Sequence, residues 1–257
     1  MMNTFFDQGQ FDIRCEWGLG GIERLAPADV IVVVDVLSFT TTVDVALSRG
    51  MTIFPYRWAD DSAREYARER SAELAGRRGE DGRYTLSPAS LLHAPRDLRL
   101  VLPSPNGSQL AFEARSRGAI VLAGCVRNAT AVAAQAIQLG KRINIVPAGE
   151  RWPDGTLRPA VEDIIGAGAI IRSLPGSRSP EAQTAVAVFD RFAEHLRCGL
   201  IDCSSGRELC DRGFVLDVEL AAEIDFSSVV PALQDDKFVR AGEIGELRAG
   251  TSRRQSE

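Results

Sequence analysis

Residues 30–42 read VIVVVDVLSFTTT. The five β-branched residues at the start of this stretch predict a strand buried on both faces, as in a parallel sheet covered by helices. Asp35 follows near the carboxyl end of that strand, and Thr40, Thr41 and Thr42 stand where the next helix should begin. Ligands of open α/β sheets bind beyond the carboxyl ends of the strands. The segment therefore predicts a carboxylate, several hydroxyls and helix N-terminal amides at one place, which suits a phosphate beside a divalent cation.

The bulk composition is that of an ordinary soluble globular protein. The chain has 257 residues, 45% hydrophobic and 25% charged, with a formal net charge of −5. This mild acidity argues against nucleic acid or anionic lipid as the main partner. No apolar run approaches a membrane span, and residues 1–17 lack the basic start and apolar stretch of a signal peptide. The five cysteines include no Cys-x-x-Cys pair, so we expect reduced thiols in a cytoplasmic protein and no zinc site.

Strand-like and helix-like segments alternate through the first part of the chain. Short β-branched runs predict strands, and apolar residues spaced three or four apart predict helices. Such alternation indicates βαβ units and an α/β fold with a mainly parallel sheet sandwiched by helices. The predicted strands are 30–36, 52–56, 98–102, 119–123 and 143–146, and the predicted helices are 40–48, 60–75, 108–117 and 129–139.

The later part of the chain is predicted to be mostly helical. Helices are expected at 161–174, 180–197 and 205–212, and a short strand at 215–218. The sequence Leu-Pro-Gly-Ser at 174–177 marks a subdomain boundary. We therefore divide the chain into an α/β part that carries most of the proposed site, residues 1–174, a helical part packed on it, residues 175–232, and a polar tail expected to fray, residues 233–257.

The turn after the predicted strand 98–102 is rich in residues that control the backbone. It reads PSPNGS at 103–108, with Ser104 between two prolines. Proline fixes φ, and Asn-Gly tolerates positive φ. The amides of Gly107 and Ser108 would then point into the crevice of the sheet, where they could bind an anion. The alternative is a tight turn in which Asn106 or Ser108 only caps the helix.

A third strand-turn-helix segment reads GCVRNAT at 124–130. Asn128 is a natural N-cap, and the guanidinium of Arg127 could neutralise a bound anion because its fork matches phosphate or sulfonate oxygens. The alternative is a capped helix with an exposed arginine. Cys125 is expected to be a small buried residue rather than a nucleophile, since no histidine lies near it in sequence.

A fourth segment combines acids and arginines. It reads PAGERWPDG at 147–155, with Glu150 and Arg151, and RPAVED at 158–163, where the helix begins with Glu162 and Asp163. Acids in a first helical turn are favoured by the helix dipole alone. This pair, however, stands in an apolar segment, so at least one carboxylate should face inward. Together with Asp35 they could supply hard oxygen ligands for Mg²⁺.

Two glycine runs and the histidines carry no motif that we recognise as catalytic. The runs GLGG at 18–21 and GAG at 166–168 lack the context of a dinucleotide fingerprint, because the first precedes the first clear strand and the second lies inside a predicted helix. His93 falls in a predicted loop and His195 on a charged helix. We therefore expect no Ser-His-Asp triad.

The ordered set of these short motifs resembles the 2-phosphosulfolactate phosphatase family. The resemblance covers roughly residues 15–232. The motifs that carry it are Val-Asp-Val-Leu at 34–37, the threonines at 40–42, Asn-Gly-Ser at 106–108, Asn-Ala at 128–129, Ala-Gly at 148–149, Glu-Asp at 162–163 with Gly-Ala-Gly at 166–168, and Ser-Ser-Gly-Arg-Glu-Leu at 204–209 with Gly213 and Asp217-Val218.

The resemblance implies a Mg²⁺-dependent phosphomonoesterase with an α/β fold of its own type. The substrate of the family is (2R)-2-phospho-3-sulfolactate, which is hydrolysed to 3-sulfolactate and phosphate on the way to coenzyme M. This chain differs at two places. Ser38-Phe39 stands where the family commonly has Arg-Ala, and Gly-Arg-Arg-Gly at 76–79 with Leu-Ser-Pro at 86–88 replaces Gly-Glu-Arg and Gly-Asn-Ser-Pro. The loss of an arginine and a glutamate near an anion site would suit a different acid-ester substrate. Arg127 and Arg151 could then compensate for the lost arginine.

On this hypothesis, Asp35 with one or both of Glu162 and Asp163 holds Mg²⁺, and Asp35 or Glu150 activates water. The threonines and the turn at 104–108, with Asn106, stabilise the charge of the transition state, while Asn128 and the two arginines line the substrate site. The partner is a small anionic phosphate ester, and a symmetric homodimer is the default assembly. Two alternatives stay open, namely a non-catalytic module that binds phosphate esters or nucleotides, and an interaction protein with a vestigial site.

Overall fold

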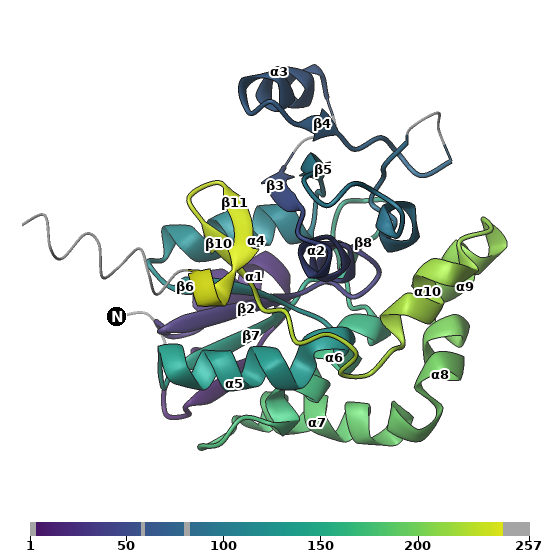
Figure 1. The fold of residues 1–257 in the computed structure, drawn as a ribbon. Coiled ribbons are helices and arrows are strands. Elements are labelled where there is room, and N and C mark those ends of the chain that lie inside the picture. Colours follow the sequence, from purple (N-terminus) through teal and green to yellow (C-terminus); the bar gives the residue numbers. More distant parts are fainter. Residues whose placement is uncertain (1–3, 58–59, 80–82, 244–257) are drawn as a thin grey trace, which may run out of the picture.

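One mixed sheet runs through the centre of the molecule (Figure 1). The structure, a computed structural model, describes residues 4–57, 60–79 and 83–243. Within these residues, nine strands lie side by side in the order β1-β7-β2-β6-β10-β11-β3-β5-β4. Their bounds are β1 Ile13–Cys15, β2 Val30–Val34, β3 Thr52–Tyr56, β4 Glu73–Leu74, β5 Arg99–Pro103, β6 Ile120–Gly124, β7 Ile143–Pro147, β10 Pro231–Gln234 and β11 Lys237–Arg240.

The strand β2 is central to the parallel part of the sheet. It pairs in parallel with β6 and β7, and Val34 at its end lies opposite Gly124 and Pro147. The carboxyl ends of these three strands therefore meet at one edge. A second parallel set contains β3, β5 and β4, and the antiparallel hairpin β10–β11 joins the two sets by pairing with β6 and β3. The predicted α/β class with a mainly parallel sheet is confirmed.

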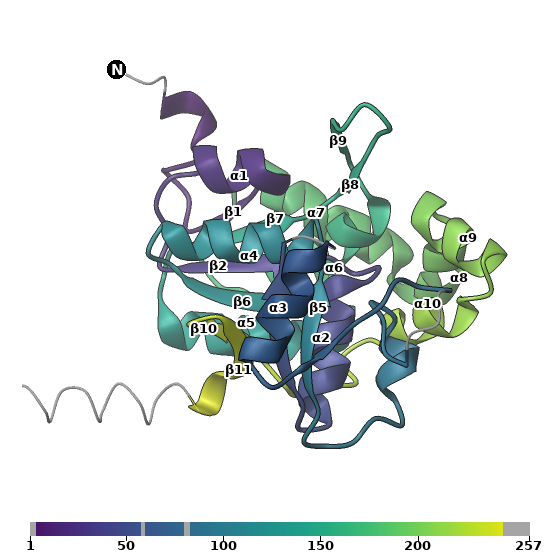
Figure 2. The same cartoon turned by 90° about the horizontal axis from the view of Figure 1, so that it is seen from above.

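Helices cover both faces of this sheet (Figures 1 and 2). Side chains of β2 alternate between two cores, because successive residues of a strand point to opposite faces. Val32 packs in a core with α5, α6 and α7, whereas Val33 packs in a core with α2 and α4. The helices are α1 Gly18–Arg24, α2 Phe39–Ser48, α3 Asp61–Glu69, α4 Gly107–Ser116, α5 Ala129–Leu139, α6 Val161–Arg172, α7 Pro180–Phe192, α8 Leu196–Asp202, α9 Ser204–Asp211 and α10 Val215–Ala221.

The elements expected around the first three turns are confirmed with bounds shifted by at most two residues. The strand β2 is fully buried along its length, as its apolar run predicts. The helix α5 has the predicted bounds. The glycines of α6 serve packing, since a Cβ on Gly166 would lie 2.6 Å from a methyl of Val36, and one on Gly168 would lie 2.0 Å from the main-chain oxygen of Ala185 in α7.

Three predicted elements are wrong: two helices have the wrong length, and one strand is a helix. The helix predicted over 60–75 stops at Glu69, because the chain turns at Ser71 with φ 47° and then adds β4 to the sheet edge. The helix predicted over 180–197 is divided by a 3-10 turn at Ala193–His195. The strand predicted at 215–218 is the helix α10, which buries Asp217, Val218, Leu220 and Ala221 on one face.

The segment 231–240, assigned from sequence to the end of the helical part and the beginning of the polar tail, forms the hairpin β10–β11 (yellow in Figure 1). Asp235 makes the turn with φ 54°, and Phe238 packs edge-on against Phe39 with ring centroids 5.9 Å apart. Leu233 and Phe238 pack in the core on one face of the sheet, and Ala232 packs in the core on the other. Residues 244–257 of the predicted tail lie outside the described residues.

Further elements were not expected from the sequence. These are β1, α1 and a separate two-stranded arm made of β8, Glu150–Arg151, and β9, Leu157–Arg158, which projects from the body in Figure 2. No helix in the described part of the chain is long and apolar enough to cross a membrane. The five cysteines form no disulfide bond.

Candidate functional site

Asp35 lies at the carboxyl end of β2 and connects two helix starts. Its Oδ1 accepts a hydrogen bond from the amide of Phe39, the first residue of α2, at 3.1 Å. Its Oδ2 accepts one from the amide of Gly107, the first residue of α4, also at 3.1 Å. The side chain is buried, and the close approach of α4 requires glycine, since a Cβ on Gly107 would overlap the ring of Phe39. Asp35 is therefore fixed where two helix dipoles converge.

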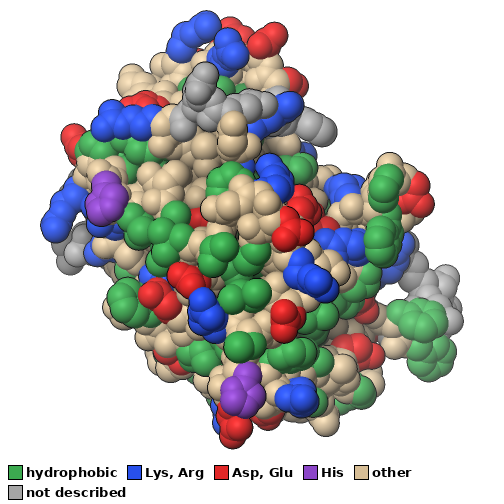
Figure 3. Space-filling model, turned by 90° about the vertical axis from the view of Figure 1, so that its right-hand side faces the viewer, with side chains coloured by type: hydrophobic (Ala, Val, Ile, Leu, Met, Phe, Trp, Pro, Cys, Tyr) green, Lys and Arg blue, Asp and Glu red, His purple; other side chains and the backbone are tan. Residues whose placement is uncertain are grey.

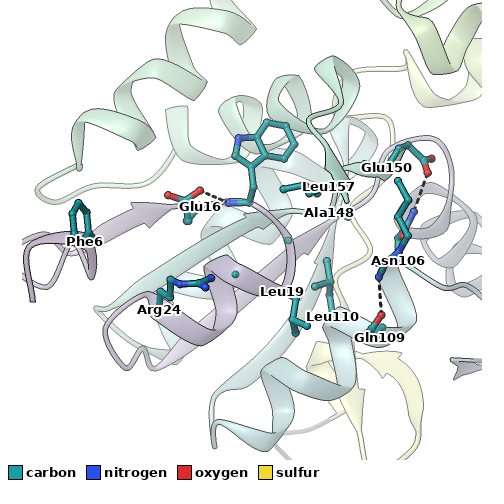
Figure 4. Close-up of a pocket in the computed structure, with 14 residues that line it drawn as sticks. Phe6, Glu16, Leu19, Arg24, Asn106, Gln109, Leu110, Ala148, Glu150 and Leu157 are labelled. Carbon is teal, nitrogen blue, oxygen red and sulfur yellow. Dashed lines mark hydrogen bonds between the residues drawn. The ribbon is translucent and has the colours of Figure 1, made fainter. Parts of the chain in front are cut away.

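Glu150 and Asn106 approach this aspartate from two other elements. Asn106 immediately precedes α4, and its amide nitrogen donates to Oε2 of Glu150 at 3.0 Å (Figure 4). Glu150 begins the arm directly after Gly149 at the end of β7. The predicted catalytic set of Asp35, Asn106 and Glu150 is thus brought to one edge of the sheet.

The first turn of α6 adds two buried carboxylates. Both oxygens of Asp163 are used by main-chain amides, at 2.7 Å from Val36 and at 2.8 Å from Gly149. Glu162 accepts a weak contact of 3.4 Å from the thiol of Cys203. Asp163 therefore ties the ends of β2 and β7 to α6, while the oxygens of Glu162 keep lone pairs for a cation or a hydrogen-bond donor.

The carboxylates at this edge of the sheet raise one another's pKa values. Burial is the main cause that raises the pKa of Asp35, to about 6. The hydrogen bonds from the amides of Phe39 and Gly107 oppose this rise in the pKa, and the charge of Glu162 adds to it. Burial also raises the pKa of Glu150 to about 7, with further rises from Asp35 and Glu162. The pKa of Asp163 lies well above its usual range because of burial and the same two acids. The four carboxylates thus share one site in which negative charge exceeds nearby positive charge.

Arg78 is a site residue that the sequence prediction missed. Its guanidinium donates to the hydroxyl of Ser38 and to the main-chain oxygen of Leu86, and lies 3.2 Å from the carboxylate of Asp217 in α10. It is close enough to Asp35 to lower the pKa of that carboxyl, and its Nε is buried without a partner. The two arginines in the segment 76–79 were visible in the sequence as candidate anion-binding residues. Only the fold shows that Arg78 lies near Asp35, at the end of β2.

Comparison with known proteins identifies the family. Residues 21–236 match the model of the 2-phosphosulpholactate phosphatase family. The chain belongs to this family. It is 31% identical over 238 residues to a 2-phosphosulfolactate phosphatase of Methanothermobacter thermautotrophicus, with 88% of this chain and 96% of that protein covered. It is also 30% identical to proteins named probable 2-phosphosulfolactate phosphatase of Carboxydothermus hydrogenoformans and of Thermus thermophilus, with 84% and 87% of this chain and 93% of each relative covered.

The 2-phosphosulfolactate phosphatase family is a family of phosphoric monoester hydrolases, and the resemblance found in the motifs is confirmed. The acidic edge contains most of the motifs that carried it, namely Val-Asp-Val-Leu, Asn-Gly-Ser, Ala-Gly and Glu-Asp. Figure 3 looks at the molecule from the side of α9 and α10, and acidic and basic side chains lie interspersed near the centre of this face.

The hydroxyls predicted to bind phosphate are engaged with the main chain in this family member. Thr40, Thr41 and Thr42 are fully buried and donate to the main-chain oxygens of residues 35, 36 and 38 at 2.7–2.8 Å. Ser104 accepts from the amide of Gly107 at 3.2 Å, and Ser108 donates to Leu102 at 3.4 Å. These hydroxyls stabilise the two turns that hold Asp35 and place the helix starts.

The residues of the third predicted segment lie in a different network. Arg127 is buried and donates to Asp44 at 2.9 Å, to the main-chain oxygen of Leu220 at 3.1 Å and to Glu223. Asn128 accepts from the amide of Cys125 and donates to the main-chain oxygen of Val229. The structure therefore does not bring Arg127 or Asn128 to the acidic edge, because both are used to attach residues 220–229.

Arg151 remains near the site but points along its rim. Its guanidinium donates to Gln109 of α4 at 3.1 Å and to the main-chain oxygen of Gly155 at 3.3 Å, and the side chain is exposed. Arg158, at the other end of the arm, donates to Ser205 of α9 at 3.0 Å. The arm is thereby attached to α4 on one side and to α9 on the other.

The donor set fits Mg²⁺ held by few protein ligands. In residues 4–57, 60–79 and 83–243, no group of three or more His, Cys, Asp or Glu side chains is arranged to hold a metal ion. The structure therefore does not assemble Asp35, Glu162 and Asp163 into one cage, and the two oxygens of Asp163, like those of Asp35, accept one main-chain amide each. Mg²⁺ commonly takes one or two carboxylates together with waters and phosphate oxygens. Asp35 and Glu162 can provide such a pair, with Asp163 as support.

Proposed function

We propose that this chain is a Mg²⁺-dependent phosphomonoesterase that hydrolyses a small phosphorylated hydroxyacid. The observation that carries the proposal is a group of four carboxylates, with Asp35, Glu162 and Asp163 buried and Glu150 partly buried, at the carboxyl edge of the sheet beside the start of α4. The relatives are named for 2-phosphosulfolactate, so (2R)-2-phospho-3-sulfolactate is the reference substrate, with 3-sulfolactate and phosphate as products.

In this proposal Asp35 and Glu162 hold the cation. Bound Mg²⁺ supplies Lewis-acid polarisation of the phosphoryl oxygens. Asp163 keeps the ends of β2 and β7 at a fixed distance from α6 through its two amide bonds. The N-terminal end of α4 favours the negative charge of the phosphate.

Arg78 is the cation that we assign to the phosphoryl group. Its charge lies near Asp35, its exposure is only 12% for the side chain, and Asp217 and Ser38 hold the guanidinium in place. A buried guanidinium stabilises an anion more strongly than an exposed one, because little water competes. Arg78 thus takes the anion-binding role that the sequence prediction gave to Arg127 and Arg151.

Glu150 is the group that we assign to proton transfer. It is held by Asn106, it lies near Asp35, and a carboxyl whose pKa is about 7 can gain or lose a proton near neutral pH. As the oxygen of water bonds to phosphorus, Glu150 accepts the proton that this water loses. The bond between phosphorus and the ester oxygen breaks, the ester oxygen leaves with the electron pair and takes a proton from solvent, and hydroxyacid and phosphate result.

The test is phosphate release from a panel of phosphorylated hydroxyacids that includes (2R)-2-phospho-3-sulfolactate, with Mg²⁺ and with EDTA. We expect turnover only with the metal. The chain is a binding module instead if these esters raise its melting temperature without any release of phosphate. It is neither enzyme nor binder of such esters if no ester has any effect, which would support an interaction protein with a vestigial site.

A further inference from the structure

A pocket opens beside the proposed catalytic residues (Figure 4). Its volume is about 490 Å³, and Asn106 and Glu150 form part of its wall. The same wall continues along α4 with Gln109 and Leu110, and the opposite wall is formed by the segment before and within α1. The pocket is therefore continuous with the place where we assign proton transfer from the attacking water to Glu150.

The glycine run GLGG at 18–21, which matched no nucleotide motif, makes room for this pocket. Gly18 adopts φ 56°, and a Cβ there would lie 3.3 Å from the main-chain oxygen of Ala148. At Gly20 a Cβ would meet only the end of the flexible Arg24 side chain, at 2.7 Å. The first turn of α1 can thus approach the end of β7 while leaving open space in front of it. Gly21 serves packing instead, since a Cβ there would lie 2.6 Å from the main-chain oxygen of Glu16.

The inner lining is mainly apolar. Trp17, Leu19, Leu110 and Leu157 line it, and the charged side chains of Glu16, Arg24 and Arg151 accompany them. In Figure 4, Leu19 of α1 and Leu110 of α4 lie next to each other. An apolar lining next to a catalytic carboxyl favours a ligand that has carbon substituents close to its reacting group.

The volume of the pocket indicates how long the carbon substituent of the ligand can be. Pockets that enclose small organic ligands commonly have volumes of roughly 300–1,000 Å³ and bury most of the ligand surface. A three-carbon hydroxyacid would leave much of a 490 Å³ pocket unfilled. A substituent of several carbon atoms would remove both its own surface and the apolar lining from water, which is favourable in proportion to the buried area.

We infer that the preferred substrate of this phosphatase is an O-phosphorylated hydroxyacid that carries an apolar substituent of several carbons, bound in the pocket between α1, α4 and the arm. This inference rests on the proposed function, because it names the substrate class of the same site. The apolar substituent contacts Leu19, Leu110 and Leu157, and the reacting phosphate lies toward Glu150 and Asp35.

The test compares kcat/KM for O-phosphorylated lactate, 2-hydroxyisocaproate and 3-phenyllactate, all with Mg²⁺. We expect the isocaproate ester to exceed the lactate ester by roughly 10- to 50-fold, as burial of three more carbon atoms predicts. In the variant Gly20→Phe, whose new side chain fills the pocket, this ratio falls to within about threefold. Gly242→Phe is the matched control, since a Cβ at Gly242 has nothing within 4 Å, and it keeps the wild-type ratio.

The outcomes separate this inference from the proposed function. Equal kcat/KM for the three esters in the wild type, or a ratio that Gly20→Phe leaves unchanged, overturns the inference while the phosphatase stands. Release of phosphate from none of these esters, nor from (2R)-2-phospho-3-sulfolactate, overturns the proposed function itself. A change of oligomeric state in Gly20→Phe with an unchanged ratio assigns the pocket to a contact between copies of the chain and also overturns the inference.

Discussion

Two buried aspartates belong to the same strand-to-helix unit but have different environments. Asp35 precedes α2, and Asp44 lies within it. Burial raises the pKa of both carboxyls above the usual range. Around Asp44, hydrogen bonds from Ser227 and Arg127 oppose this rise, whereas Asp35 has only main-chain amides and the more distant Arg78 to oppose burial and the charge of Glu162.

The difference separates a structural ion pair from a candidate catalytic centre. The Asp44–Arg127 pair is 2.9 Å apart and nearly inaccessible, and Arg127 also pairs with Glu223, so the fold itself supplies the opposite charge for Asp44. Asp35 and the three acids near it, Glu150, Glu162 and Asp163, are left with a deficit of positive charge, which a divalent cation would remove. An acid that ends a buried strand therefore indicates function only when its charge is not compensated by the fold.

The largest expected effect comes from Asp35→Asn. This change keeps the shape of the side chain but removes the charge that holds the cation, so we expect kcat to fall by roughly 100- to 1000-fold. Phosphate release under saturating Mg²⁺ measures it. Circular dichroism and the melting temperature establish that the variant is folded. A folded Asp35→Asn enzyme with full activity would show that the acidic edge is not the catalytic site.

The second effect concerns stability rather than catalysis. Arg127→Met leaves Asp44 buried without its ion partner, so we expect a loss of about 3 kcal/mol in the free energy of unfolding. Denaturant titration measures this loss, and kcat/KM of the folded fraction should stay near the wild-type value. The double variant Arg127→Met with Asp44→Asn should recover part of the stability, because the unpaired charge is gone. A large rise in KM at unchanged stability would instead place Arg127 in the substrate site.

The third effect tests the assignment of Arg78. Removal of a charge-assisted contact to the phosphate in Arg78→Ala should lower kcat/KM by roughly 10- to 100-fold. Arg78→Lys should restore only part of this, because lysine cannot reproduce the planar fork. The comparison of the two variants distinguishes loss of charge from loss of geometry. Equal activity of all three proteins would remove Arg78 from the site.

A smaller effect follows from the raised pKa values. In metal-free protein, folded Asp35 and Glu150 bind protons more tightly than in the unfolded chain, with pKa values of about 6 and about 7. The folded state therefore holds more protons between about pH 4 and 7, and stability falls as pH rises through this range. We expect the melting temperature in EDTA to drop by several degrees from pH 5 to 8, and less with Mg²⁺. The same slope in both conditions would contradict a cation at these carboxylates.

The sequence predicted the parts of the fold that depend on local patterns. The β-branched run at 30–34 and the apolar spacing of residues 129–139 specify their elements without distant partners. The hairpin β10–β11 could not be predicted in this way. Its strands have four residues each, and they pair with β6 and β3, which lie more than a hundred residues earlier in the chain.

The sequence predicted the acidic residues of the candidate site but not its basic residue, Arg78. Asp35, Glu150 and Glu162 were recognisable because they follow strands or begin a helix. Arg78 was missed because its position depends on Asp217, which also binds Ser87 from 130 residues away. In the sequence, a threonine at a helix start looks the same whether its hydroxyl binds phosphate or the main chain. The structure shows that the hydroxyl of Thr40 donates to the main-chain oxygen of Asp35.

The most direct measurement is a crystal structure of the protein with Mn²⁺ and inorganic phosphate, with the cation located by its anomalous signal. We predict one Mn²⁺ bound by Asp35 and Glu162, with phosphate between it and Arg78. A cation that binds elsewhere while the acidic edge stays free of metal, or a phosphate held by Arg127, would contradict the account.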